Sequence, residues 1–174
     1  MNKEKKPSKG SETFSWRKLP LETKYRVGLR SLSGEIGAFR MLIPQLLGAE
    51  KGIEALNKFY AGLAHQAYQR AKAKGILKGD DIKDVAAFIC TVLDSEGLSV
   101  EVEATEERIR IQLNKHSPEL CPWGIPKGNP GLCCGVAWTR ELVELVNPKL
   151  TAYLSKAKRW GDDYCEEVIE WKKE

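Results

Sequence analysis

Through the first half of the chain, apolar residues recur at steps of three and four, the spacing of one face of an α-helix. In residues 21–47 the recurring apolar positions are Leu29, Leu32, Ile36, Phe39, Ile43 and Leu46. Pro44 is expected to kink or end this helix early, and Gly48 to stop it. A second helix is predicted over residues 49–74. A third is predicted from Asp80 or Asp81, either of which suits an N-cap, to Ser95.

The periodicity changes at Gly97. Apolar and polar residues then alternate over residues 98–104 and again over residues 108–113, which is the pattern of two half-buried strands. We expect them to form a hairpin with one apolar face. Its other face would carry a ladder of Glu and Arg residues paired across the strands and exposed to water.

The remainder contains a loop over residues 114–130, a helix over about 131–146 and two strands over 150–160 and 164–171, joined by a turn at 161–163. The sequence therefore predicts an α+β fold with three N-terminal helices, a β-hairpin, a helix and a second β-hairpin. The two hairpins would join into one antiparallel four-stranded sheet covered by helices. Residues 1–12 are expected to be a disordered basic tail, and residues 13–174 a single domain.

Charge and hydropathy narrow the classes of partner. The net charge is +4, but residues 1–12 carry four Lys and two Glu, so the remaining chain carries 4 − 2 = +2. This dilution predicts no nucleic-acid partner, since a basic stripe on the folded domain is not evident. The absence of a long apolar run predicts no membrane association by a spanning helix. With no apolar segment after the first charges, a cytoplasmic location is expected. The apolar helix stripes would also suit a homodimer interface.

The chain has five cysteines, an odd number, so we expect reduced thiols rather than a disulfide framework. Cys90 falls within an apolar helical run and is expected to pack in the core. The others gather in the last third, in or beside loops: Cys121, Cys133, Cys134 and Cys165. Cys134 lies in the first turn of a predicted helix, where free backbone N–H groups favour a thiolate.

Three interpretations of this cysteine cluster stay open. Some of its members, with His116, would ligate zinc, although the spacing matches no standard zinc motif. Alternatively, one thiolate acts as a nucleophile, with His116, Asp162 or Asp163 assisting proton transfer. The third interpretation is that the cysteines only fill small apolar gaps. His65, in the second helix, is expected at the helix surface or the edge of the core.

A set of spaced motifs carries a resemblance to a known family. The motifs are Cys121-Pro122-Trp123, Cys134 at a helix start, Asn147-Pro148, and Gly161-Asp162-Asp163-Tyr164-Cys165-Glu166. Over residues 110–172 the chain resembles the L-2-amino-thiazoline-4-carboxylic acid hydrolase-like family. More distantly, it is similar to 4-vinyl-reductase domains, which share an architecture with a transport-particle subunit.

The resemblance implies an α/β domain that hydrolyses a C–N or C=N bond of a small cyclic substrate by opening a thiazoline ring. The matching positions are Cys121, Cys134, Asn147, Gly161, Asp162 and Cys165. Cys134 would be the nucleophile or a metal ligand, Cys121 and Cys165 would line the site, and Asp162 would assist. Some relatives hold zinc with a Glu and a Cys before the corresponding glycine, but residues 153–160 here contain neither. We therefore expect a small-molecule-binding domain with a cysteine-lined pocket. This domain would either hydrolyse its ligand or act as a non-catalytic sensor or accessory module that binds a ligand or a metal.

Overall fold

The computed structural model describes residues 19–95, 98–113 and 135–173. Its elements are α1 (Leu21–Leu47), α2 (Ala49–Ala73), α3 (Ile82–Ser95), β1 (Val100–Ala104), β2 (Arg108–Leu113), α4 (Gly135–Val146), β3 (Leu150–Lys156), the 3₁₀ helix η3 (Lys158–Trp160) and β4 (Cys165–Trp171). The predicted α+β class and the predicted order of elements are confirmed. The predicted tail at residues 1–12 and the predicted loop at 114–130 lie outside the described residues.

The four strands form one antiparallel sheet in the order β1-β2-β4-β3. Residues directly opposite one another share a face, so the register sorts the side chains into two sets. One set is mostly apolar and includes Ile109, Ile111, Ala152 and Ile169, which are fully buried. The other set is mostly polar. One face of the sheet therefore belongs to the core.

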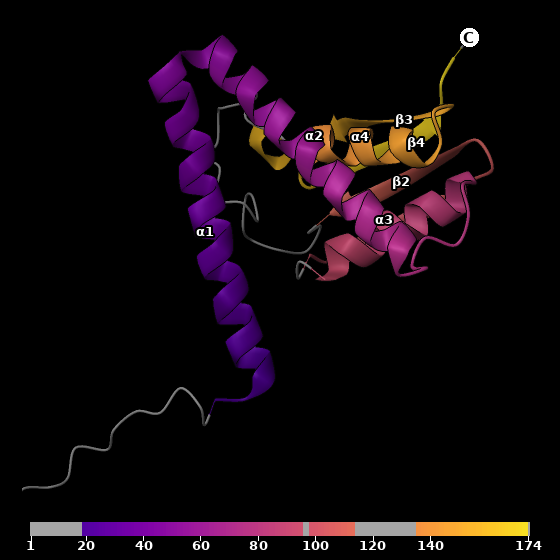
Figure 1. The fold of residues 1–174 in the computed structure, drawn as a ribbon, viewed down its shortest axis with the longest axis horizontal. Helices are drawn as coiled ribbons and strands as arrows, with labels where there is room; N and C mark the ends of the chain where they lie inside the picture. The colour runs from indigo at the N-terminus through magenta and orange to yellow at the C-terminus, as the bar shows by residue number, and fades with distance from the viewer. Residues whose placement is uncertain (1–18, 96–97, 114–134, 174) are drawn as a thin grey trace, which may run out of the picture.

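Helices cover the apolar face (Figure 1). α4 packs against β3, α3 packs against β1, β2 and β4, and α2 lies against α4. Leu142 and Val143 of α4 are fully buried in this layer. The helix α1 pairs with α2 and stands to one side of the layered body (Figure 1). None of the described helices combines the length and the apolar character that crossing a bilayer requires.

Local chemistry sets two of the helix boundaries. Asp81 Oδ1 accepts 2.8 Å hydrogen bonds from the backbone N–H groups of Lys83 and Asp84, so Asp81 caps α3 as predicted. Pro44 does not end the first helix early, because α1 continues to Leu47. Gly48 follows with a φ of 81°, and α2 begins at the next residue, which makes α1 and α2 a helical hairpin.

One predicted strand is too long. The segment 150–160 was expected to be a single strand, whereas β3 ends at Lys156 and η3 follows. The reason is local hydrogen bonding around Ala157. Its carbonyl accepts from the N–H of Trp160, and its own N–H donates to Asp162 Oδ2 at 2.8 Å. These bonds close a tight turn in place of further pairing with β4.

Candidate functional site

A carboxyl group lies on the apolar, helix-covered face of the sheet. Cys165, Glu167 and Ile169 alternate along β4 and share that face. Glu167 is opposite Ile111 on β2 and Leu154 on β3. Its side chain is 4% exposed. The two strand neighbours of this buried acid are therefore aliphatic, which leaves the helices to supply polar contact.

The helix α4 supplies one hydrogen bond. The hydroxyl of Thr139, itself buried, donates to Glu167 Oε2 at 2.8 Å. Burial raises the pKa of Glu167 to about 7, and the bond from Thr139 opposes that rise. Near neutral pH both the protonated and the ionised carboxyl are populated. Glu167 can therefore donate or accept a hydrogen bond within an apolar layer.

Two cysteines border this acid. Cys90, on α3, is half-buried and packs against the core, as expected from the sequence. Its pKa is raised, first by burial and then by the negative charge of Glu167. Cys90 is therefore held as a thiol, the weakly nucleophilic form. Cys165, two residues before Glu167, is also half-buried and packs against the same core.

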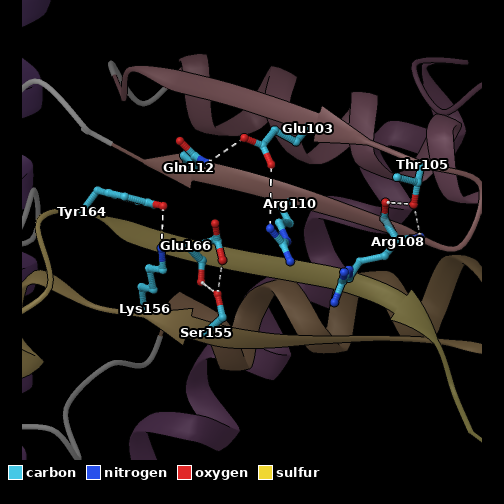
Figure 2. Close-up of polar contacts among 9 residues, drawn as sticks. All are labelled: Glu103, Thr105, Arg108, Arg110, Gln112, Ser155, Lys156, Tyr164 and Glu166. Atoms are coloured by element: carbon cyan, nitrogen blue, oxygen red, sulfur yellow. Dashed lines mark hydrogen bonds and ion pairs between the residues drawn. The ribbon is translucent and has the colours of Figure 1, made fainter.

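The opposite face of the sheet is polar, as Figure 2 shows. Gln112 Nε2 donates to Glu103 at 3.3 Å, and Glu103 and Arg110 approach to 3.9 Å across β1 and β2. The predicted cross-strand pairing of Glu with Arg is confirmed. Glu166 is as buried as Glu167, but it accepts a 2.6 Å bond from Ser155 on this polar face. Two adjacent glutamates thus lie in contrasting surroundings.

A second buried polar contact lies where α1 meets α2. Arg40 of α1 is 2% exposed, and its guanidinium lies 4.4 Å from the centroid of the Tyr60 ring on α2. Its Nε donates to the Tyr60 hydroxyl. Trp138 of α4 packs against both the Tyr60 cluster and the main core, and it neighbours Thr139 in the chain. Trp138 thus links this contact to the layer that holds Glu167.

Of the predicted nucleophiles, zinc ligands and proton-transfer residues, the structure describes Cys165, Asp162 and the alternative Asp163. Cys165 begins β4 on the helix-covered face, and Asp162 lies in the exposed turn after η3, where it accepts the bond from Ala157. His116, Cys121, Cys133 and Cys134 lie outside the described residues. Within the described ranges, no group of three or more His, Cys, Asp or Glu is placed to hold a metal ion. Cys165 is the one predicted zinc ligand that these ranges include, so the zinc site stays a prediction.

Glu167 and Thr139 were not predicted as site residues. The signal for Glu167 was present in the alternation of β4, where a carboxyl residue occupies a position between two inward-facing residues. No sequence pattern marks Thr139, because its role depends on how α4 crosses the sheet. His65 lies at the helix surface as expected, 2.9 Å from Glu141 on α4.

A scan of known family models gives no match to this chain, and a search of curated proteins also gives none. The similarity to known proteins is therefore one of fold. The described helices and sheet define a small α+β fold of helices packed on one antiparallel sheet.

The solved structures that share this fold include the following two. The first is trafficking protein particle complex subunit 3 from Naegleria fowleri, covalently bound to palmitic acid. It has a TM-score of 0.56 and 16% identity, over 85% of this chain and 97% of that one. The second is the phenol-responsive sensory domain of the transcription activator PoxR, solved with phenol. It has a TM-score of 0.57 and 12% identity, over 82% of this chain and 74% of that one. The expected similarity to a transport-particle subunit is confirmed as one of fold, and the thiazoline hydrolase family is not shown.

Proposed function

We propose that this chain binds a small, largely apolar molecule between its helices and its sheet, with Glu167 as the polar anchor. The observation that carries the proposal is the burial of this carboxyl in an apolar layer, where it accepts a hydrogen bond from Thr139. An acid in such a place costs stability unless it is satisfied. Strongly perturbed acids gather at functional sites, and an apolar site with a few polar groups is typical for small ligands.

The two structural neighbours support this choice of ligand chemistry. The PoxR sensory domain was solved with phenol, and the Naegleria fowleri subunit with palmitic acid. Each molecule joins an apolar body to one polar group. Glu167 would meet that polar group as donor when protonated and as acceptor when ionised, while Ile111 and Leu154 would contact the apolar body.

The protonation state of Cys90 favours non-covalent binding of the ligand over covalent attachment to this cysteine. Attachment of an acyl chain to a cysteine begins with attack by the thiolate. Burial and the charge of Glu167 both raise the pKa of Cys90, which keeps it protonated at neutral pH. The thiol then contributes to the apolar wall beside the acid.

Calorimetric titration of the full chain with phenol, and separately with palmitic acid, tests the proposal. We expect saturable binding of at least one probe, weakened about tenfold or more by Glu167→Gln, a loss equivalent to about 1.4 kcal/mol. The matched control is Glu166→Gln, an equally buried neighbour on the opposite face, which should leave binding unchanged. Equal effects of the two substitutions, or binding of neither probe by the wild-type chain, would contradict the proposal.

A finer hypothesis, motivated by the family resemblance, is that the bound molecule is a small cyclic substrate whose C–N or C=N bond is hydrolysed. Cys134 would then be the nucleophile or a zinc ligand, with Cys121, Cys165, His116 and Asp162 around it. Ring opening of 2-aminothiazoline-4-carboxylic acid by wild type and by Cys134→Ala tests the catalytic role. Metal analysis of the purified chain tests the zinc. Binding without turnover would favour the alternative, a non-catalytic sensor or ligand-carrying module.

A further inference from the structure

The helix α1 exposes an apolar stripe. Residues Tyr25, Leu32, Phe39 and Leu46 recur every seven positions and are between 42% and 68% exposed. Seven residues are almost two full helical turns, so these side chains lie on one side of α1. A seven-residue apolar repeat is the pattern of a helix that packs along another helix.

The buried contact with α2 lies beside this stripe and touches it where Phe39 packs against Phe59. Among the α1 residues whose burial the structure describes, Gly37 and Arg40 are buried, and Arg40 lies against Tyr60 of α2. On an α-helix with 100° per residue, Gly37 and Arg40 lie on a different side from Leu32 and Leu46. The stripe therefore lies beside the α2 contact rather than within it.

The exposed apolar surface continues onto α2. Phe39 packs against Phe59 with ring centroids 5.7 Å apart, and Phe59 is 47% exposed. Leu63, one turn further along α2, is also exposed. We call the surface formed by Tyr25, Leu32, Phe39, Leu46, Phe59 and Leu63 the hairpin face.

We propose that the hairpin face binds the same face of a second copy of this chain, forming a two-fold symmetric helical dimer. A symmetric pair requires one self-complementary patch, and a straight apolar stripe along a helix meets that requirement. The proposal is independent of ligand binding at Glu167, since the hairpin face lies on other residues.

The available area reaches the lower bound for a specific dimer. α1 has 27 residues, which corresponds to a length of about 40 Å. Helices pack at 8–10 Å, so a strip about 10 Å wide gives on the order of 400 Å² for α1. Phe59 and Leu63 occupy about one turn of α2, so they extend this area to roughly 500 Å² per copy, or about 1,000 Å² in total, the lower bound of a specific interface.

A lipid surface fits the stripe less well. Glu35 lies between Leu32 and Phe39 on the same side of α1, and it is exposed. Insertion of that side into acyl chains would carry the carboxylate with it, at high cost. At the rim of a helix pair, the same carboxylate stays in water.

Sedimentation equilibrium of the full chain over a wide concentration range tests the proposal. We expect a species of about 39 kDa, twice the 19.5 kDa of one chain. Leu32→Glu should weaken the dimer about tenfold or more, because it places two carboxylates in the pair. The matched control is Val27→Glu in the same helix, since Val27 is equally exposed but lies about 140° around the helix from Leu32. This control should leave the dimer intact, and circular dichroism should show both variants folded.

The proposal fails if the wild-type chain is a monomer at all concentrations, or if Leu32→Glu and Val27→Glu behave alike. Co-sedimentation with phosphatidylcholine–phosphatidylserine vesicles addresses the lipid alternative. A monomeric chain that binds those vesicles through Leu32 would overturn the dimer in favour of a membrane contact.

Discussion

The hydroxyl of Thr139 on α4 donates a 2.8 Å hydrogen bond to the carboxyl of Glu167 on β4, across the interface between helix and sheet. Both side chains are buried, and the residues opposite Glu167 on the two neighbouring strands, Ile111 and Leu154, are aliphatic. The bond offsets part of the cost of burying the acid. It also fixes where a polar group is available in an otherwise apolar layer, which is the basis of the first two predictions.

The first prediction concerns how stability varies with pH. The pKa of Glu167 is about 7 in the folded chain, above its ordinary value of 4.5. Between these values the folded state binds more protons than the unfolded state, so the free energy of unfolding should fall as pH rises. The full change attributable to this group is about 3 kcal/mol. Urea unfolding of wild type and Glu167→Gln at several pH values from 5 to 8 measures it.

The direction in which the free energy of unfolding changes with pH distinguishes Glu167 from an acid with an ordinary pKa. In Glu167→Gln the decline between pH 5 and pH 8 should be smaller by most of that amount, since the amide does not titrate. Glu166→Gln retains Glu167 and should keep the wild-type decline. A decline of equal size in all three proteins would place the titration on another group.

The second prediction concerns the donor. Thr139→Val removes a hydroxyl that favours the ionised carboxyl and lowers the pKa of Glu167. The pKa of Glu167 should therefore rise further above about 7. Thr139→Ser keeps the hydroxyl and should leave that pKa near its wild-type value. Carbon-13 NMR titration of the Glu167 carboxyl follows both variants, and an unchanged pKa in Thr139→Val would show that the hydroxyl does not stabilise the charge.

The third prediction concerns the reactivity of Cys90. Because burial and the charge of Glu167 raise its pKa, Cys90 should be alkylated by iodoacetamide much more slowly than a free thiol at pH 8. Glu167→Gln removes the smaller of the two causes, so the rate at Cys90 should rise modestly. Peptide mapping by mass spectrometry separates Cys90 from the other cysteines. A rate at Cys90 equal to that of a free thiol would contradict its burial beside the acid.

Periodicity predicted the fold well because each element buries one face. The stripe of α3 and the alternation of β2 each follow from a single apolar surface, so their bounds came within about two residues. Periodicity did not predict where β3 ends. That end depends on the bonds of Ala157 with Trp160 and Asp162, which compete with strand pairing over a few residues.

The candidate site was less predictable than the fold. Cysteine clustering pointed to the C-terminal third, and Cys165 does lie beside the buried acid. The acid itself was recognisable only once β4 was known to be covered by helices, because an exposed strand would carry a glutamate at no cost. Thr139 could not be identified without the crossing of α4 over the sheet. The assignments of Cys121, Cys134 and His116, and of residues 13–174 as one domain, stay predictions.

The fourth prediction concerns the turn between η3 and β4. Asp162→Ala removes the acceptor of the Ala157 N–H, a loss of about 1 kcal/mol in the free energy of unfolding. Gly161 has a φ of 110°, so Gly161→Ala should also destabilise the chain, by about 1 kcal/mol or more. Chemical unfolding measures both. Asp163→Ala, at the next exposed position, is the control and should have little effect, whereas an equal loss there would remove the special role of Asp162.

The last prediction compares two glycines of α2. A Cβ on Gly52 would lie 2.4 Å from the Cα of Pro44 on α1, whereas a Cβ on Gly62 would meet no atom within 4 Å. Because the obstacle at Gly52 is backbone, Gly52→Ala should force α1 and α2 apart and lower the free energy of unfolding by about 1–3 kcal/mol. Gly62→Ala adds only helix propensity and should raise it by about 0.5–1 kcal/mol. Opposite signs in urea unfolding would establish that α1 and α2 are in close contact at Pro44. Stabilisation by both substitutions would mean that the helical hairpin is looser than the structure has it.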